Sequence, residues 1–434
     1  MERAILAGMP GRAGAWNLDD DLAELAELAR SAGAEVAGTV LQRQRRLDAR
    51  TCFPSGKVAE LAEAVRTHAA DLILCNCGLS PRQQLHLEDA VSVRVIDRTR
   101  LILDIFARRA QSHEGRIQVE LAQLLYMLPR LTGLGGEMSR TGGGIGTRGP
   151  GETQLETDRR RVRARIAALR HQLEGVAASR AVQRGGRLRQ GLPQVALVGY
   201  TNAGKSTLHG ALAGAGAHAA DQLFATLDPT TRAMALPGNQ HALLTDTVGF
   251  VHDLPPDLVS AFAATLEEVT RADLLLEVVD RHHAQRWEQC TAVERVLTDL
   301  GAAALPRIVV WNKADLPAED GAAGAGELGA PPHDLPQVDV SALTGQGLDR
   351  LRDLIAAQLG QARRTVAVLL PFSAESLLAA VHRRGEVRAL HYLPDGIDLE
   401  AVCPPELAAR LEAAGLPRPR PDAPDAVPPK GNRA

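Results

Sequence analysis

Residues 194–207 read QVALVGYTNAGKST, and this stretch decides the fold of the central part of the chain. An apolar run at 194–198 leads into the pattern G-x-x-x-x-G-K-S at 199–206, after which a helix is expected. Glycines in such a loop let successive backbone N–H groups face a chain of phosphates, and the helix N-terminus adds the positive end of its dipole. Because the pattern stands between a buried strand and a helix, it predicts a P-loop nucleotide-binding domain of the α/β class.

The loop supplies residue types that match the chemistry of a phosphate site. Lys205 is expected to reach the terminal phosphates, and the Ser206 hydroxyl is expected to bind Mg²⁺. Lysine is rare in this chain, with four among the 49 Lys and Arg residues. The lysine in this loop therefore indicates a site that requires a compact point charge instead of the planar guanidinium of arginine. The nucleotide contacts predicted in this segment are Gly199, Tyr200, Thr201, Asn202, Ala203, Gly204, Lys205, Ser206 and Thr207.

Motifs farther along the chain indicate that the base is guanine. Asp315 ends the N-K-x-D pattern at 312–315, where its carboxylate can accept from both N–H donors of a guanine edge. Adenine lacks that donor pair, so the pattern predicts GTP rather than ATP as the substrate. The residues predicted on the base side are Asn312, Lys313, Ala314 and Asp315, with Ser341, Ala342 and Leu343 at a further strand end.

Two segments between these motifs complete the expected set. The D-T-V-G pattern at 246–249 offers an aspartate that can orient a Mg²⁺ water and a glycine that can sense the terminal phosphate. Thr226 is the natural switch threonine, so the predicted metal ligands are Ser206, Thr226 and Asp246. Four motifs in this order predict a GTPase domain. The nucleotide contacts predicted here are Phe224, Ala225, Thr226, Leu227, Asp228, Asp246, Thr247, Val248 and Gly249.

The predicted catalytic residues are Lys205, Asn202, Thr226 and Gly249. Phe250 follows Gly249, where many GTPases have a glutamine that orients the attacking water, and a phenyl ring cannot do this. Asn202 could help to hold a K⁺ ion that supplies positive charge to the transition state, or it could only cap the loop, and both interpretations stay open. We hypothesise that intrinsic hydrolysis is slow, and that a partner or a monovalent cation completes the site.

A second glycine-rich stretch contains G-x-G-x-x-G at 144–149, the spelling of a dinucleotide-binding loop. Such a loop needs a buried strand before it and a packed helix after it. Here polar and glycine-rich residues precede it, Pro150 interrupts it, and the helix that follows carries many arginines. The context therefore predicts a loop, at about 132–151, at the tip of two helices expected at 99–128 and 153–181.

The second of these helices is strongly basic. Between 159 and 189, ten arginines accompany one acid, Glu174, so the local net charge is +9 although the whole chain carries −3. Clustered arginine favours contact with nucleic-acid phosphates over a solvated helix face, and the lack of interleaved aromatic residues argues against stacking on single strands. The arginines are Arg159, Arg160, Arg161, Arg163, Arg165, Arg170, Arg180, Arg184, Arg187 and Arg189.

The residues before these helices alternate short apolar runs with amphipathic segments, which predicts a small parallel α/β domain. Five cysteines, an odd number at irregular spacing, favour reduced thiols over a disulfide framework. We expect neither a signal peptide nor a membrane span, because no apolar stretch of sufficient length lacks charges. The expected helices span 18–32 and a segment from about Ser80, and the expected strands span 4–7, 36–41, 72–74 and 93–96.

Several segments together resemble the HflX family of ribosome-associated GTPases. The central matches are 142–160, the phosphate loop at 199–207, LFATLDPTTR at 223–232 and DTVGFVHDLPPDLVSAFAATLEE at 246–268. SGKVAEL at 55–61, LSPRQQ at 79–84 and the stretch 97–124 also match, so the resemblance covers about residues 1–410. His252 stands where the family commonly has arginine, which could alter communication with the ribosome.

The resemblance implies an N-terminal α/β domain and a two-helix subdomain before the GTPase domain, and a small α/β domain after it. It also implies binding to the large ribosomal subunit and its ribosomal RNA, with the tip loop reaching toward the catalytic centre of that subunit. Some members split stalled ribosomes. The domains expected on this basis are 1–112, 113–190, 191–364 and 365–412, followed by a Pro-rich disordered tail at 413–434.

We expect a cytoplasmic monomer that associates with ribosomes and peripherally with the membrane. Its expected substrate is GTP and its expected metal is Mg²⁺, with K⁺ as a candidate second cation. Two alternative functions stay open: a GTPase that acts on the large subunit during ribosome assembly, and a signalling switch that binds a protein and no RNA.

Overall fold

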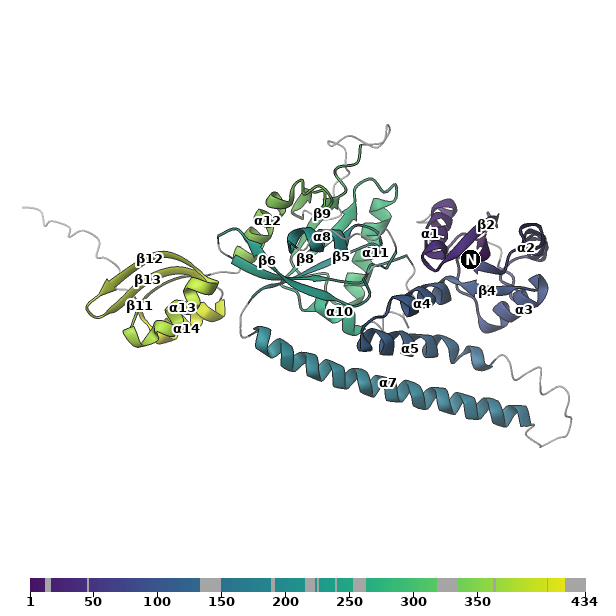
Figure 1. Ribbon diagram of the computed structural model, residues 1–434, viewed down its shortest axis with the longest axis horizontal. Coiled ribbons are helices and arrows are strands. Elements are labelled where there is room, and N and C mark those ends of the chain that lie inside the picture. The colour runs from purple at the N-terminus through teal and green to yellow at the C-terminus, as the bar shows by residue number, and fades with distance from the viewer. Residues whose placement is uncertain are drawn as a thin grey trace, which may run out of the picture.

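In the described part of the chain, three β-sheets, each with its own helices, follow one another (Figure 1). The computed structural model describes residues 1–11, 17–44, 47–132, 150–188, 192–214, 223–224, 226–238, 240–252, 263–317, 335–361, 364–403 and 405–417. The expected class, a P-loop α/β domain between two smaller domains that mix helices and strands, is confirmed.

The first domain is a four-stranded parallel sheet in the order β2-β1-β3-β4. One apolar cluster packs this sheet against α1 and α4, and a second packs it against α2 and α3. Burial on both faces is typical of parallel strands and explains why these runs are continuously apolar. The strands are β1 (Glu2–Gly8), β2 (Ala34–Leu41), β3 (Leu72–Cys75) and β4 (Arg94–Asp97), and the helices are α1 (Leu18–Ser31), α2 (Ser55–His68), α3 (Pro81–Val91) and α4 (Arg98–Arg109).

The single helix expected at 99–128 is wrong, because the chain forms two helices there, α4 and α5 (His113–Met127). The backbone of Ala110 is extended, which ends α4. The Ser112 side chain then accepts a hydrogen bond from the Gly115 N–H at 2.8 Å and caps α5. A serine in this position satisfies an N–H group that a helix cannot bond internally, so a new helix begins there.

The long helix α7 (Pro150–Leu188) exceeds the expected 153–181 and runs alongside α5 (Figure 1). Pro150 is its first residue, where a missing N–H costs nothing, so the proline begins the helix instead of interrupting it. The apolar seam between the two helices contains Ile117, Leu121, Ile166 and Leu169. We call α5 and α7 the arm. Residues 133–149 of the expected tip loop lie outside the described residues.

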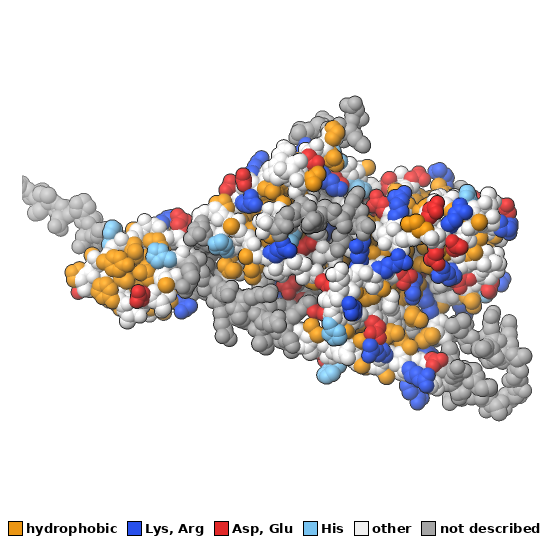
Figure 2. Space-filling model, in the orientation of Figure 1, with side chains coloured by type: hydrophobic (Ala, Val, Ile, Leu, Met, Phe, Trp, Pro, Cys, Tyr) orange, Lys and Arg blue, Asp and Glu red, His pale blue; other side chains and the backbone are white. Residues whose placement is uncertain are grey.

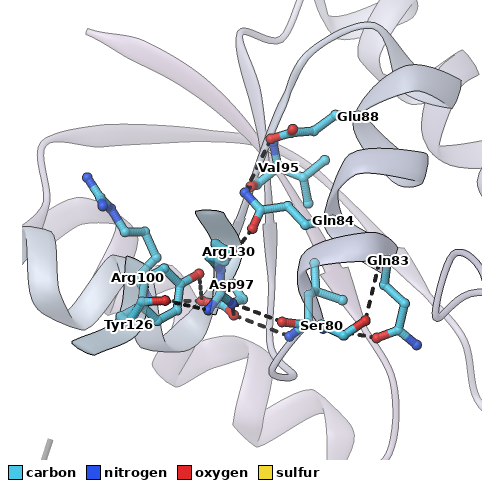
Figure 3. Close-up of polar contacts among 10 residues, drawn as sticks. Ser80, Gln83, Gln84, Glu88, Val95, Asp97, Arg100, Tyr126 and Arg130 are labelled. Carbon is cyan, nitrogen blue, oxygen red and sulfur yellow. Dashed lines mark hydrogen bonds and ion pairs between the residues drawn. The ribbon is translucent and has the colours of Figure 1, made fainter. Parts of the chain in front are cut away.

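Asp97, at the end of β4, fixes the C-terminal end of α5, next to the expected tip loop, to the first domain. Its carboxylate accepts hydrogen bonds from the Tyr126 hydroxyl at 2.9 Å and from the Arg130 guanidinium at 3.0 Å. That guanidinium also lies over the Tyr126 ring, 3.4 Å from its centre (Figure 3). Burial, followed by the charge of Asp97, raises the pKa of Tyr126 above its usual range. Asp97 is 2% exposed, so these bonds form where the dielectric constant is low and hold the end of α5 in place.

The central domain is a six-stranded sheet in the order β10-β9-β8-β5-β7-β6, in which β6 runs antiparallel to β7 and the other pairs are parallel. Separate apolar clusters cover its two faces. The strands are β5 (Gln194–Gly199), β6 (Thr230–Leu236), β7 (Gln240–Asp246), β8 (Leu274–Asp280), β9 (Arg307–Asn312) and β10 (Gln337–Asp339), and the helices are α8 (Lys205–Leu212), α10 (Ala263–Thr270), α11 (Arg286–Asp299) and α12 (Leu348–Gln361).

The last domain is a four-stranded antiparallel sheet in the order β12-β13-β11-β14, with one apolar core shared with α13 and α14. Hydrophobic side chains gather on the face of this domain that Figure 2 shows. Its exposed large hydrophobic residues include Phe372, Tyr392 and Leu416. Among the described helices, none combines the length and the apolar composition that a membrane span requires. The elements are β11 (Arg364–Leu370), α13 (Glu375–Arg384), β12 (Glu386–Leu393), β13 (Gly396–Cys403), α14 (Pro405–Ala414) and β14 (Leu416–Pro417).

Replacing Leu169 by alanine should loosen the arm and leave the central domain intact. Leu169 is fully buried in the seam between α5 and α7, and removing a buried leucine side chain costs about 2–5 kcal/mol. We expect faster amide hydrogen exchange in α7, with unchanged exchange in β5 and β8. Arg170→Ala, at the exposed neighbouring position, is the matched control. Equal exchange in α7 of Leu169→Ala and Arg170→Ala would show that the packing of Leu169 between α5 and α7 does not stabilise the arm.

Candidate functional site

The phosphate loop leaves β5 at Gly199 and enters α8 at Lys205. Gly199 has φ +144°, and a Cβ atom there would lie 2.2 Å from the backbone oxygen of Val278. Gly204 has φ +91°, and its Cβ would lie 2.2 Å from the Asn312 amide nitrogen. Only glycine fits these two turns, which let the loop curl over the end of the sheet and present the N-terminus of α8.

Lys205 lies inside this curl and is 6% exposed. Its ammonium donates to the backbone oxygens of Gly199 at 3.0 Å and Tyr200 at 2.6 Å. Burial lowers the pKa of Lys205 to about 8, and the nearby carboxylate of Asp246 partly offsets that effect. Because the charge of Asp246 only partly offsets the burial of the Lys205 ammonium, this cation is well suited to bind a further anion such as a phosphate.

Three oxygen atoms from three segments meet beside the lysine. The Ser206 and Thr226 hydroxyls each lie 2.7 Å from the same carboxylate oxygen of Asp246, and 2.7 Å from each other. The other Asp246 oxygen, Oδ1, is buried without a hydrogen-bond partner in the described part of the chain. One carboxylate with two hydroxyls fits Mg²⁺, which takes few protein ligands and completes its shell with phosphate and water oxygens.

Asn312 ties the base side of the site together. Its amide nitrogen donates to the Ala203 oxygen at 2.8 Å, and its amide oxygen accepts from the Ala342 N–H at 3.0 Å. One buried side chain therefore joins the phosphate loop, the N-K-x-D loop and the 341–343 loop. Nearby, the Ser341 hydroxyl donates to Asp315 at 2.5 Å, and Lys313 pairs with Asp280 at 2.7 Å.

Gly249 brings the D-T-V-G segment against the phosphate loop. A Cβ atom there would lie 2.8 Å from the Thr201 side chain and 3.0 Å from the Lys205 ammonium. The two segments are also joined by backbone hydrogen bonds between Phe250 and both Gly199 and Thr201, at 3.1 Å and 2.8 Å. The Phe250 ring is 2% exposed in the domain core, so its side chain does not orient a water.

Several predicted nucleotide contacts turn their side chains away from the site. Thr247 donates to the Leu197 backbone oxygen at 2.6 Å, and Leu227 is buried in the cluster of the first domain. Asp228 bonds to the start of α5, as described below. Leu343 is 71% exposed. Ala225 lies outside the described residues.

Tyr200 also turns away from the site, and it leads to residues that the sequence analysis missed. Its hydroxyl lies 2.9 Å from both carboxylate oxygens of Glu24 on α1, and accepts from the His252 N–H at 2.7 Å. The buried Arg98 pairs with Glu24 at 2.9 Å and with Asp21 at 2.8 Å. Beside this contact a cavity of about 320 Å³ lies between α1 and Asn202. No local sequence signal links α1 with the phosphate loop.

Comparison with known proteins gives the same assignment along most of the chain. Three family descriptions match in order: GTP-binding GTPase N-terminal at 19–107, GTP-binding GTPase Middle Region at 109–187, and 50S ribosome-binding GTPase at 194–313. The GTPase HflX of Caldanaerobacter subterraneus subsp. tengcongensis is 47% identical over 91% of this chain and 90% of its own length. The chain belongs to the HflX family of GTPases.

Other members of the HflX family have similar sequence identity to this chain. The GTPase HflX of Akkermansia muciniphila is 40% identical over 95% of this chain and 97% of its own, and that of Escherichia coli is 47% identical over 68% and 70%. A solved GTP-binding protein from Sulfolobus solfataricus, in complex with GDP, is 23% identical over 83% of this chain and 99% of its own, with a TM-score of 0.44. As an HflX-family GTPase, the chain hydrolyses GTP.

Replacing Asn312 by alanine should weaken GDP binding by about 10–100-fold, because each buried polar group left without a partner costs about 1–3 kcal/mol. The Ala203 oxygen and the Ala342 N–H both lose their bond. Affinity is measured with a fluorescent GDP analogue. The control is Asp349→Asn on α12, whose side chain is 99% exposed. Unchanged affinity of Asn312→Ala would show that the three loops do not depend on this residue.

The affinity for GDP should fall as the pH rises above the pKa of Lys205, which is about 8 in the free protein. Phosphates stabilise the charged lysine, so above that pH binding must take up a proton, and affinity falls by up to about tenfold per pH unit. Below it the lysine is charged in both states and contributes no pH dependence. Guanosine, which has the base without phosphates, corrects for titration of the base. Parallel curves for GDP and guanosine would contradict this role of Lys205.

Proposed function

We propose that this GTPase binds the large ribosomal subunit through its arm and uses GTP hydrolysis to split or recycle stalled ribosomes. The observation that carries the proposal is the charge of α7. Arg160, Arg161, Arg163 and Arg170 are exposed on the described part of this helix. Their ion pairs with acids of the same helix are long, for example 3.5 Å between Arg161 and Asp158 and 3.9 Å between Arg163 and Glu156.

Long, exposed ion pairs contribute little energy, so these arginines can exchange their partners for phosphates of ribosomal RNA. Over 159–189 the helix has a net charge of +9. The matching family description, 50S ribosome-binding GTPase, supports the large subunit as the partner. Ile166 and Leu169 of α7 pack on α5, and the exposed arginines are spread over the rest of the helix circumference, which supports an arm that presents basic side chains to RNA.

We also propose roles for the residues of the nucleotide site. Ser206, Thr226 and Asp246 would hold Mg²⁺, which supplies positive charge to the phosphates when bound, and Lys205 would bind the terminal phosphates. Asp315 would read the guanine edge. Asn202 is exposed and lines the cavity next to α1, and its φ of +61° is a left-handed conformation that asparagine adopts more readily than most residues. A role in the turn of the loop and a role toward a monovalent cation are therefore both consistent with its position.

Reversing part of the arm charge should weaken subunit binding and leave GTP binding intact. The triple variant Arg160→Glu, Arg161→Glu, Arg163→Glu removes up to three phosphate contacts, so its salt dependence should be shallower by about 0.9 per lost contact on a log–log plot. Binding is measured by co-sedimentation with large subunits across a salt series. Arg295→Glu, exposed on α11, is the control. If the triple variant bound subunits as well as the wild type, these arginines would not contact ribosomal RNA, and a protein partner would be favoured.

A further inference from the structure

Thr226 is held between two contacts with the α4–α5 segment. Two residues before it, the ring of Phe224 meets the ring of Phe106 on α4 edge-on, with centres 4.6 Å apart at an angle of 70°. Phe224 is 2% exposed and has φ +55°, a left-handed conformation that a bulky residue adopts at a cost. Two residues after Thr226, Asp228 reaches the start of α5.

The Asp228 carboxylate binds the N-terminus of α5 directly. One oxygen accepts from the N–H groups of Ser112 at 2.8 Å and Gln111 at 3.3 Å, and the other accepts from the Ser112 hydroxyl. Ser112 is also the residue that caps α5. A carboxylate at this end of a helix is favoured by the unpaired N–H groups and by the helix dipole. The contact therefore joins the segment around Thr226 to the first turn of the arm.

Gly115 makes this contact possible. A Cβ atom at Gly115 would lie 2.5 Å from the nearer Asp228 oxygen and 3.1 Å from the Ser112 hydroxyl oxygen. Glycine is a poor helix former, and a glycine in the first turn of α5 weakens that helix. The carboxylate of Asp228 fills the space that a side chain at position 115 would occupy. The contact between Asp228 and α5 therefore requires glycine at this position.

We propose that Asp228 and Gly115 couple the position of Thr226 to the arm, so that α5 senses which nucleotide is bound. Thr226 belongs to the oxygen cluster with Ser206 and Asp246. In the predicted site this cluster holds the Mg²⁺ ion that contacts the phosphates, so loss of the terminal phosphate would change what holds Thr226. A shift of Thr226 pulls on Asp228, two residues along the chain. Asp228 then releases or holds the first turn of α5, which packs on α7 through the apolar seam.

The test is amide hydrogen exchange in residues 110–120, compared with GDP and with a non-hydrolysable GTP analogue bound. We expect exchange of the Gln111 and Ser112 amides to differ by about tenfold between the two nucleotides in the wild type. Gly115→Ala should reduce that difference to less than about twofold. Alanine is the better helix former, so a loss of coupling in this variant is not caused by a lower intrinsic helix propensity.

Gly175→Ala is the matched control, because a Cβ atom there meets nothing within 4 Å and the substitution lies in the same arm. Equal exchange with both nucleotides in the wild type, or a full nucleotide difference in Gly115→Ala, would overturn the proposal. Coupling between two sites is reciprocal, so Gly115→Ala should also change the ratio of the affinities for GDP and for the GTP analogue.

A second measurement, the stimulation of GTP turnover by large subunits, rests on the proposed ribosomal function. It distinguishes failure of the coupling from failure of that function. Large subunits should stimulate GTP turnover of the wild type and of Gly175→Ala, and should stimulate Gly115→Ala much less. Equal stimulation of all three would reject the coupling and leave the ribosomal function standing. Nucleotide-dependent exchange in α5 without any stimulation by subunits would support the coupling and reject the ribosomal function.

Discussion

The carboxylate of Asp246 is the point on which the nucleotide site depends. It stands at the end of β7, and its oxygen receives the Ser206 hydroxyl from α8 and the Thr226 hydroxyl from the preceding switch segment. Three segments that are distant in sequence therefore meet at one charge. At 2% exposure, a carboxylate with an unpaired oxygen is stable only beside cations, and Lys205 and a bound metal can supply that charge.

Three segments of the GTPase domain contact the first domain or the arm. Tyr200 of the phosphate loop meets Glu24, Asp228 of the switch segment meets the start of α5, and Val248 and Val251 after β7 are buried in the cluster of the first domain. Residues of these segments share one apolar cluster with α1 and α4. A change of nucleotide therefore has direct routes into the parts of the molecule outside the GTPase domain, which suits a protein whose two states matter more than its product.

The central fold, and the meeting of the predicted site motifs at one end of its sheet, could be predicted because their signals are local. The strand–loop–helix context of Lys205 and the short motifs ending at Asp315 each lie within one segment, and each residue type follows from its chemistry. The break between α4 and α5 was missed because the Ser112 cap lies inside a run that otherwise looks helical. The directions of Tyr200 and Asp228 were missed because they depend on packing against Glu24 and Ser112, which lie more than 100 residues away.

The most direct test of the account is GTP turnover by the purified protein in potassium buffer, with and without large ribosomal subunits. The account predicts slow turnover by the protein alone, because a buried phenylalanine, Phe250, stands where many GTPases have the glutamine that orients the attacking water. It predicts an increase on the order of 10–10³-fold with subunits, as expected when a missing transition-state contact is supplied. Turnover that is the same with and without subunits would contradict the account and assign the basic arm to a different partner.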